Sequence, residues 1–357
     1  MSASSRLKFD WYLVLPSLLL LFLGLTVLKS VASDLVIFQL LFTFIAIVFF
    51  LLFSSTDFQL PLTLHLPIYF LTVVFLLTPF VFGIHSRGAL RWLQIGQFSL
   101  QPSELAKPFL LMAFAMLAIS PLRRKFVWLF GSFMLPWTII FFQPDLGTSL
   151  VIFVGWLTIL LSRLSLKTVL LSGLILAIFL FPISHYALKN YQKDRLLTFA
   201  NPYRDPLGQG YHVIQSLIAV GSGSLLGRGL GHGPQSQLRF LPEHHTDFIF
   251  AAISEELGFV GSSLVLTLFA ILLWRIYRIS QSVSSPAASL FCLSVLSMLT
   301  FQIFINIGMN MGIAPITGIP LPYLSYGGSS LLSLGILIGL VNSISTRNTS
   351  PTSLQIS

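Results

Sequence analysis

Asp247 is the acidic residue with the most unusual position in this sequence. It stands where a long polar segment ends and an apolar run begins at Phe248. An ionised carboxylate is costly in hydrocarbon, so an acid at such a boundary is generally retained for a site rather than for packing. A carboxylate that meets both lipid and water is suited to take a proton from a bound substrate. Asp247 is therefore the first candidate catalytic residue.

Glu104, Lys107 and Asp145 are further candidates, each at the start of an apolar run. Residues three apart share one side of a helix, so Glu104 and Lys107 can form an ion pair. The pair either stabilises the helix or lines a cavity, and we favour the cavity because intramembrane charges usually face one. Asp145 follows Pro144, where the alternatives are a site residue and a cap for the first helical turn.

Glu255 and Glu256 lie eight and nine residues after Asp247. On a straight helix this spacing places them about 12 to 14 Å further along the axis and turned away by roughly 80 to 180°. They cannot form a close carboxylate pair with Asp247. We expect structural contacts with a neighbouring helix, with a role in holding a cavity open as the second alternative.

The composition indicates the class of protein that must position these residues. Of 357 residues, 55% are hydrophobic, only 9% are charged and 33 are phenylalanine. Such a chain is typical of lipid rather than water, so we predict an all-α polytopic membrane protein that forms one integral membrane domain over 1–357. Apolar runs near the roughly 20 residues needed to cross a bilayer predict ten spans. The expected spans are 11–29, 35–53, 66–84, 103–120, 126–142, 146–162, 167–186, 248–274, 287–311 and 326–345, with a tight turn at 143–145.

Lysine and arginine predict the orientation of these spans. With the N-terminus inside, the short cytoplasmic segments hold ten of them and the short outer segments hold three. This positive-inside bias predicts cytoplasmic termini, and it accounts for much of the +9 net charge without nucleic acid. The segments rich in Gly, Pro and polar residues then share the outer face, where a substrate is expected. Residues 346–357 are predicted to form a disordered cytoplasmic tail.

The outer segment 187–246 is too long to be an idle connector. It carries six basic residues, and six glycines fall between positions 221 and 233. Such a surface can hold a diphosphate through arginine forks and exposed backbone N–H groups. The alternative is a flexible lid with solvated charges. A nucleotide-type phosphate loop is weakly indicated, because no strand or Rossmann-sized unit precedes the glycines.

Short motifs occur along most of the chain in a fixed order. They are QPSE (101–104), QPDLGT (143–148), GQGYHVIQS (208–216), FLPE (240–243), TDFIF (246–250), EELG (255–258), NIGM (306–309), PLP (320–322) and SYGG (325–328). Each is modest alone, but their order and spacing are highly specific. The set resembles the SEDS family, most closely its RodA branch.

This resemblance implies a ten-helix peptidoglycan polymerase. Such an enzyme joins lipid II units at the outer face of the bacterial cytoplasmic membrane, beside a class B penicillin-binding protein that cross-links the strands. The family's essential acid falls on Asp247, its cavity residues on Glu104 and Lys107, its second outer acid on Asp145 and a basic loop position near the diphosphate on Arg195. The expected substrate-binding set also includes Arg91 and His245.

The neighbouring His244 departs from the family pattern, because relatives often carry arginine or lysine at this position. A grip on diphosphate from here would depend on protonation of the histidine.

Glycosyl transfer fits these residues. Asp247 would act as general base on the acceptor sugar hydroxyl, and no second carboxylate is required because a diphosphate leaves without the proton donation that glycosidases use. A divalent cation, Mg²⁺ or Mn²⁺, could share the diphosphate charge, although no ligand cluster with metal spacing is present in the sequence. The apolar surface between helices would accept the polyprenyl tail and membrane lipid.

Two other functions stay open at this stage. A flippase or exporter of the lipid-linked precursor would need the same lipid groove and basic mouth, although the sequence contains no convincing internal repeat of the kind common in transporters. A non-catalytic scaffold for the penicillin-binding protein would need only the helices. Extension of lipid II by purified protein, and its loss in Asp247→Ala, would separate a polymerase from a flippase. The scaffold predicts instead that Asp247→Asn keeps cell shape as long as the protein still assembles with its partner.

Overall fold

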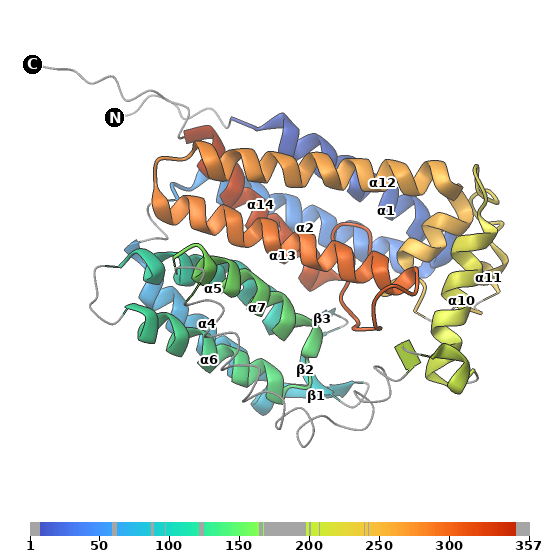
Figure 1. The fold of residues 1–357 in the computed structure, drawn as a ribbon, viewed down its shortest axis with the longest axis horizontal. Coiled ribbons are helices and arrows are strands. Elements are labelled where there is room, and N and C mark those ends of the chain that lie inside the picture. The colour runs from blue at the N-terminus through green and yellow to red at the C-terminus, as the bar shows by residue number, and fades with distance from the viewer. Residues whose placement is uncertain are drawn as a thin grey trace, which may run out of the picture.

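The computed structural model describes residues 8–58, 63–86, 89–96, 98–120, 125–163, 167, 198–199, 201–206, 208–238, 240–241 and 243–347. Long helices make up most of this part of the chain (Figure 1). They are α1 (Trp11–Val31), α2 (Val36–Ser55), α4 (His65–Phe82), α5 (Pro102–Ile119), α6 (Lys125–Phe142), α7 (Leu146–Leu161), α12 (Ile249–Ser282), α13 (Pro286–Asn310) and α14 (Gly328–Arg347). Shorter helices are η1 (Ser33–Leu35), η2 (Pro202–Arg204), α10 (Gln209–Ser222) and α11 (Pro234–Gln237).

Nine of the ten expected spans coincide with the long helices, and the tenth, 167–186, lies outside the described residues. Seven of these helices are long and apolar enough to cross a membrane, whereas α6 and α7 contain shorter apolar stretches. The chain is an all-α polytopic membrane protein, as its composition predicted. The total of ten stays a prediction. α12 continues past the expected end at 274 to Ser282, because a polar residue ends a hydropathy run without ending a helix.

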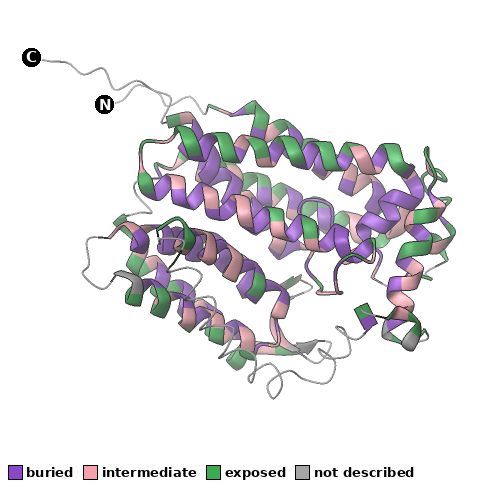
Figure 2. Cartoon of the chain, in the orientation of Figure 1, coloured by how far each residue is buried: buried purple, intermediate pink, exposed green. Residues whose placement is uncertain are grey.

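Two helices form the centre of the bundle. α14 packs against α2 and α5, while α13 packs against α7, α5 and α12. Figure 2 shows α5 and α14 as largely buried, in contrast to α2, whose apolar side chains Ile37 and Phe44 are exposed. Exposed apolar side chains on the outer helices are expected in lipid, where they contact hydrocarbon.

A small antiparallel sheet between α4 and α5 was not expected. Its strands β1 (Gly83–Ser86), β2 (Ala89–Ile95) and β3 (Phe98–Leu100) lie in that order. Leu93 pairs with Gly83 on one side and with Leu100 on the other. Strands this short give no clear alternation of polar and apolar residues, so the sequence predicted only a polar outer segment here. The sheet carries Arg91 on β2.

α12 is interrupted at Gly258, where φ is +65° and ψ is −161°. The N–H groups of Phe259 and Val260 donate to the carbonyls of Ser224 and Leu225 at 2.9 and 3.1 Å. A backbone group left unbonded in a membrane is costly, so a break in a membrane helix needs such partners.

The same segment also bonds to the other side of the break. The carbonyls of Glu255 and Glu256 accept from the N–H groups of Arg228 and Gly229 at 2.9 and 3.0 Å. The Gly231 N–H donates to the carboxylate of Glu256 at 3.1 Å. These N–H groups are engaged within the protein, so the expectation that the glycine-rich run offers them to a diphosphate is wrong for residues 228, 229 and 231.

The carboxylates of Glu255 and Glu256 make structural contacts, as predicted, although most of their partners come from α11 and the glycine-rich segment before it. Glu255 accepts from the N–H groups of Gln235 and Ser236 at 2.8 and 3.0 Å, and so caps α11. Glu256 accepts from Ser30 Oγ at the end of α1 at 2.5 Å. Both glutamates are fully buried. They attach the segment before α12 to α12 itself.

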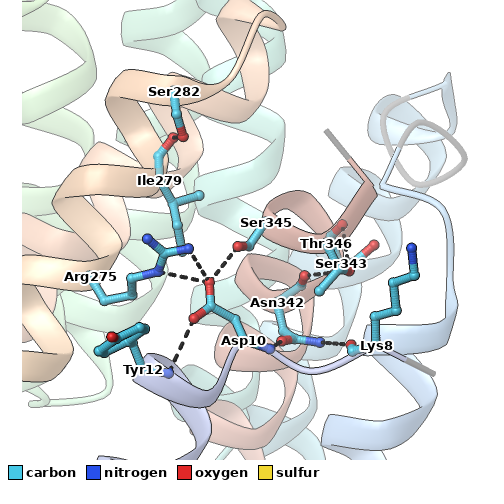
Figure 3. A network of polar contacts seen from close by, with 10 residues as sticks. All are labelled: Lys8, Asp10, Tyr12, Arg275, Ile279, Ser282, Asn342, Ser343, Ser345 and Thr346. Carbon is cyan, nitrogen blue, oxygen red and sulfur yellow. Dashed lines mark hydrogen bonds and ion pairs between the residues drawn. The ribbon is translucent and has the colours of Figure 1, made fainter. Parts of the chain in front are cut away.

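A polar network joins α1, α12 and α14 near the other end of α12 (Figure 3). The Asp10 carboxylate lies 2.8 Å from Arg275 Nε and 2.7 Å from Arg275 Nη2, and it also accepts from the Ser345 hydroxyl. The Asp10 N–H donates to Asn342 Oδ1 at 2.9 Å, and Asn342 Nδ2 donates to the Lys8 carbonyl at 3.2 Å. Arg275 is one of the basic residues from which the orientation of the membrane spans was predicted. In the structure it anchors the C-terminal half of α12.

Gly258→Ala is expected to destabilise the fold by more than about 1 to 3 kcal/mol, the usual cost of a strained backbone alone. The positive φ disfavours a side chain, and a Cβ would lie 2.2 Å from the backbone nitrogen of Gly227. Gly131→Ala on α6 is the matched control, because a Cβ there meets nothing within 4 Å. Thermal unfolding in detergent measures both. Equal melting temperatures for the two variants would contradict this account of the break.

Candidate active site

Asp145 is the centre of a buried polar network at the N-terminal ends of α5 and α7. As the cap of α7 it accepts from the Thr148 N–H at 3.3 Å. Its second oxygen accepts from Gln101 Nε2 at 2.6 Å and from Ser103 Oγ at 2.8 Å. Pro102 opens α5, where its missing N–H costs nothing. Capping and membership of a site were the two alternatives predicted for Asp145. It caps α7, and its bonds to Gln101 and Ser103 also connect α7 to the start of α5.

Glu104 and Lys107 form the expected ion pair on α5. Lys107 Nζ lies 2.7 Å from Glu104 Oε2, and the two side chains are only 3% and 6% exposed. Thr148 Oγ1 donates to the other carboxylate oxygen of Glu104 at 3.4 Å, which connects the pair to α7. Burial of two charges is tolerated here because each charge offsets the desolvation of the other.

Arg91 extends this network towards solvent. Its Nη1 lies 3.4 Å from Asp145 Oδ1, and 28% of its side chain is exposed. Arg91 is therefore the more accessible partner of a nearly buried carboxylate. The structure thus brings together four predicted site residues: Arg91, Glu104, Lys107 and Asp145.

Asp247 lies in the turn that precedes α12. The Thr246 and Phe248 N–H groups both donate to the Glu243 carbonyl, at 3.1 and 3.2 Å, which closes the turn. Asp247 is half-buried, and its Oδ2 lies 3.7 Å from the point where a Cβ on Gly318 would be. Gly318 has a φ of +72°, so glycine fits both the backbone and the space beside the carboxylate.

His245 lies in the same turn and contacts the segment before α14. Its carbonyl accepts from the Tyr326 N–H at 2.8 Å, and the two ring centroids are 6.0 Å apart. His245 is half-buried, so this predicted residue belongs to the Asp247 side of the site.

Residues 317–319 connect the two groups of predicted site residues. A Cβ on Gly147, two residues after Asp145, would lie 3.0 Å from Ile319 Cγ1 and 3.4 Å from the Thr317 carbonyl. Gly318 in the same segment adjoins Asp247. The N-terminus of α7 and the Asp247 turn therefore contact the same short segment, and we treat the two groups as one site.

His244 has a different role from the diphosphate grip considered for it. It is buried, with Nδ1 2.8 Å from the Leu241 carbonyl and Nε2 3.1 Å from the Val31 carbonyl at the end of α1. Both ring nitrogens contact backbone carbonyls of the protein, so they do not face a diphosphate. His244 instead connects the Asp247 turn to α1. Arg195 lies outside the described residues.

In the described part of the chain, no group of three or more His, Cys, Asp or Glu side chains is placed to hold a metal ion. Both Asp145 oxygens already accept from protein donors. The divalent cation considered for the diphosphate therefore stays an expectation.

Sequence reasoning missed several neutral polar residues of the site. Asn306 and Asn310 on α13 are fully buried, and both donate to the Asp247 carbonyl at 3.1 Å. The available signal was two amides four residues apart in an apolar run, because this spacing places them on one helix face. Gln101, Ser103 and Thr148 belonged to quoted motifs, but nothing local indicated that Asp145 and Glu104 were their partners.

Comparison with known proteins identifies the family. The family described as "Cell cycle protein", which comprises FtsW, RodA and SpoVE, matches residues 11–350. The peptidoglycan glycosyltransferase MrdB of Escherichia coli K12 is 40% identical over 285 residues, covering 78% of this chain and 77% of MrdB.

Solved structures agree with this match. A chain from a study of how a peptidoglycan synthase complex coordinates polymerization and crosslinking has a TM-score of 0.84 at 33% identity, covering 97% of this chain and 100% of that one. The rod shape determining protein RodA of Thermus thermophilus has a TM-score of 0.71 at 26% identity, covering 96% and 99%. The chain therefore belongs to the FtsW, RodA and SpoVE family, the SEDS family that its motifs indicated.

Lys107→Met alone is expected to destabilise the protein by about 3 to 5 kcal/mol, because it leaves the buried Glu104 carboxylate without its counter-ion. The double variant Glu104→Gln/Lys107→Met removes both charges and should recover most of the loss. Unfolding in detergent, followed by tryptophan fluorescence, measures all three proteins. A double variant no more stable than Lys107→Met would show that the ion pair is not the interaction being lost.

Proposed function

We propose that this chain is an inverting peptidoglycan glycosyltransferase that polymerises lipid II into glycan strands for cell elongation and shape. Family membership and the activity named for the Escherichia coli relative support this function. The observation that carries it is the half-buried Asp247 carboxylate at the start of α12, beside a segment that also contacts the Arg91–Asp145 network.

In the proposed reaction Asp247 is the general base. It takes the proton from the 4-hydroxyl of the acceptor's N-acetylglucosamine as that oxygen attacks the anomeric carbon of the donor's N-acetylmuramic acid. The new bond forms as the bond to the diphosphate oxygen breaks, and the polyprenyl diphosphate leaves with the electron pair. The configuration at the anomeric carbon inverts, and the proton remains on Asp247 until it passes to water.

The diphosphate is proposed to bind on the Arg91 side of the site. The Arg91 side chain is 28% exposed while Asp145 lies beside its guanidinium, and a guanidinium is well suited to phosphate oxygens. Glu104 and Lys107 bind substrate less directly, because their charges are paired inside the protein. His245 and Arg195 are proposed as further substrate contacts. The divalent cation stays an expectation, and no step is assigned to it.

The proposed location is the bacterial cytoplasmic membrane, with both termini in the cytoplasm and the site at the outer face. The excess of lysine and arginine in the short inner segments supports this orientation. The proposed partner is a class B penicillin-binding protein, and the likeness to a chain of a peptidoglycan synthase complex supports it. The apolar outer surface contacts membrane lipid, and no nucleic acid takes part.

Asp247→Asn is expected to lower the rate of lipid II polymerisation by roughly 10² to 10⁴-fold, the usual contribution of a general base. Glu243→Gln is the matched control, since Glu243 is an acid in the same half-buried turn without a role in the proposed reaction. Purified proteins are compared by gel analysis of labelled glycan strands. Normal polymerisation by Asp247→Asn would contradict the base assignment.

Topology is tested separately by cysteine labelling. In intact cells a membrane-impermeant maleimide is expected to label Glu243→Cys but not Arg278→Cys, which should react only after permeabilisation. The native Cys292 is fully buried and gives a low background. The reverse pattern would place Asp247 on the cytoplasmic side, where lipid II polymerisation at the outer face is impossible.

A further inference from the structure

The side-chain amide of Asn310 stands inside the first turn of α12. In a continuous helix the Ala251 N–H would donate to the Asp247 carbonyl four residues earlier. Here the Ala251 N–H donates to Asn310 Oδ1 at 2.9 Å, and Asn310 Nδ2 donates to the Asp247 carbonyl at 3.1 Å. A side chain inserted in this way replaces one helical hydrogen bond with two hydrogen bonds that pass through its amide group.

The insertion keeps Asp247 outside the regular helix. Phe248, the residue between Asp247 and α12, has φ −108° and ψ 26°, which are not helical values. Without the amide, the Asp247 carbonyl and the Ala251 N–H would be free to bond to each other and to extend the helix by one residue. That extension would redirect the Asp247 side chain, because side-chain direction follows the backbone.

Asn306 connects the backbone of Asp247 to the segment that faces its carboxylate. Its Nδ2 donates both to the Asp247 carbonyl at 3.1 Å and to the Ile319 carbonyl at 2.8 Å. These two carbonyls flank the place where Asp247 Oδ2 approaches Gly318. One amide group thus sets the distance between the turn that carries the acid and the segment that faces it.

The hydrogen-bonding capacity of the two amides is used with little excess. Asn310 Nδ2 has a second short contact, 2.7 Å to the Asn306 carbonyl, so its two hydrogens serve two acceptors. Asn310 and Asn306 are both fully buried. A network satisfied in this way defines a single geometry, since any rotation of an amide leaves a buried group unbonded.

We propose that Asn310, assisted by Asn306, is a positioning residue that holds the Asp247 carboxylate in its reactive place by replacing a helical hydrogen bond. The role rests on the proposed function, because it has a catalytic consequence only if Asp247 is the base. It differs from ordinary core stabilisation, since loss of the Asn310 amide leaves two backbone groups that can satisfy each other. The fold is retained while the carboxylate moves.

The decisive variant is Asn310→Ala, and its matched control is Asn342→Ala. Asn342 is also fully buried and bonds through both ends of its amide, to the Asp10 N–H and the Lys8 carbonyl, in the inner network (Figure 3). Asn310→Asp is a second variant that keeps the size and an acceptor for Ala251 but loses the donating NH₂ group. Each is purified at full length beside wild type and Asp247→Ala. Melting temperature, kcat and KM for lipid II are measured for every protein.

Asn310→Ala and Asn310→Asp are expected to lower kcat by roughly 10 to 100-fold, as for a small misplacement of a catalytic group, with KM changed little. Asn342→Ala should lower the melting temperature more than Asn310→Ala but keep kcat. An inactive Asp247→Ala together with wild-type kcat in both Asn310 variants overturns the positioning role alone. An active Asp247→Ala overturns the base assignment and the positioning role with it, whereas wild-type protein that forms no glycan strands overturns the proposed function itself. A fall in kcat for Asn342→Ala as large as for Asn310→Ala would also overturn the positioning role, because it would show a general effect of amide loss.

Discussion

The constraint on which this structure depends is that backbone N–H and C=O groups within a membrane must find partners in the protein. The long helices meet it along most of their length, but α12 departs from regular helix at its start and at Gly258. At the start an asparagine amide supplies the bonds, and at Gly258 residues 224–229 supply them. Both departures are therefore fully supported features of the fold.

Charge is handled by the same principle. The acids of α5, α7 and α12 that were singled out in the sequence are nearly all buried, and each accepts from several donors or pairs with a cation. Asp247 is distinguished by partial exposure. The proposed base needs access to its substrate, whereas a structural carboxylate needs hydrogen-bond donors for both of its oxygens. These opposite needs separate Asp247 from Asp145 and Glu255.

Much of the helical framework was predictable, because hydropathy reports directly on which residues face lipid. The turn at 143–145 followed from its proline and polar residues, and the Glu104–Lys107 pair and the separation of Glu255 and Glu256 from Asp247 followed from spacing along a helix. The small sheet around Arg91 did not, since strands of a few residues give too little periodicity. Nor did the partners of Asp145, because Gln101 lies 44 positions away and only tertiary packing brings the two together.

The glycine-rich segment shows why a composition can mislead. Glycines near basic residues are compatible with phosphate binding, but those at 227, 229 and 231 lie where the backbone must adopt positive φ. Gly227 also serves a close approach of chain to chain at the break in α12, because a Cβ there would lie 2.1 Å from the Glu256 carbonyl oxygen. The same residues could not be assigned to one role or the other without knowing what lies beside them.

The break at Gly258 divides α12 into two helical pieces. The piece of α12 before Gly258 is held by α13 and the glycine-rich segment, and the piece after it is held by Asp10 against α1 and α14. The attachments of α12 to the rest of the chain therefore differ on the two sides of Gly258.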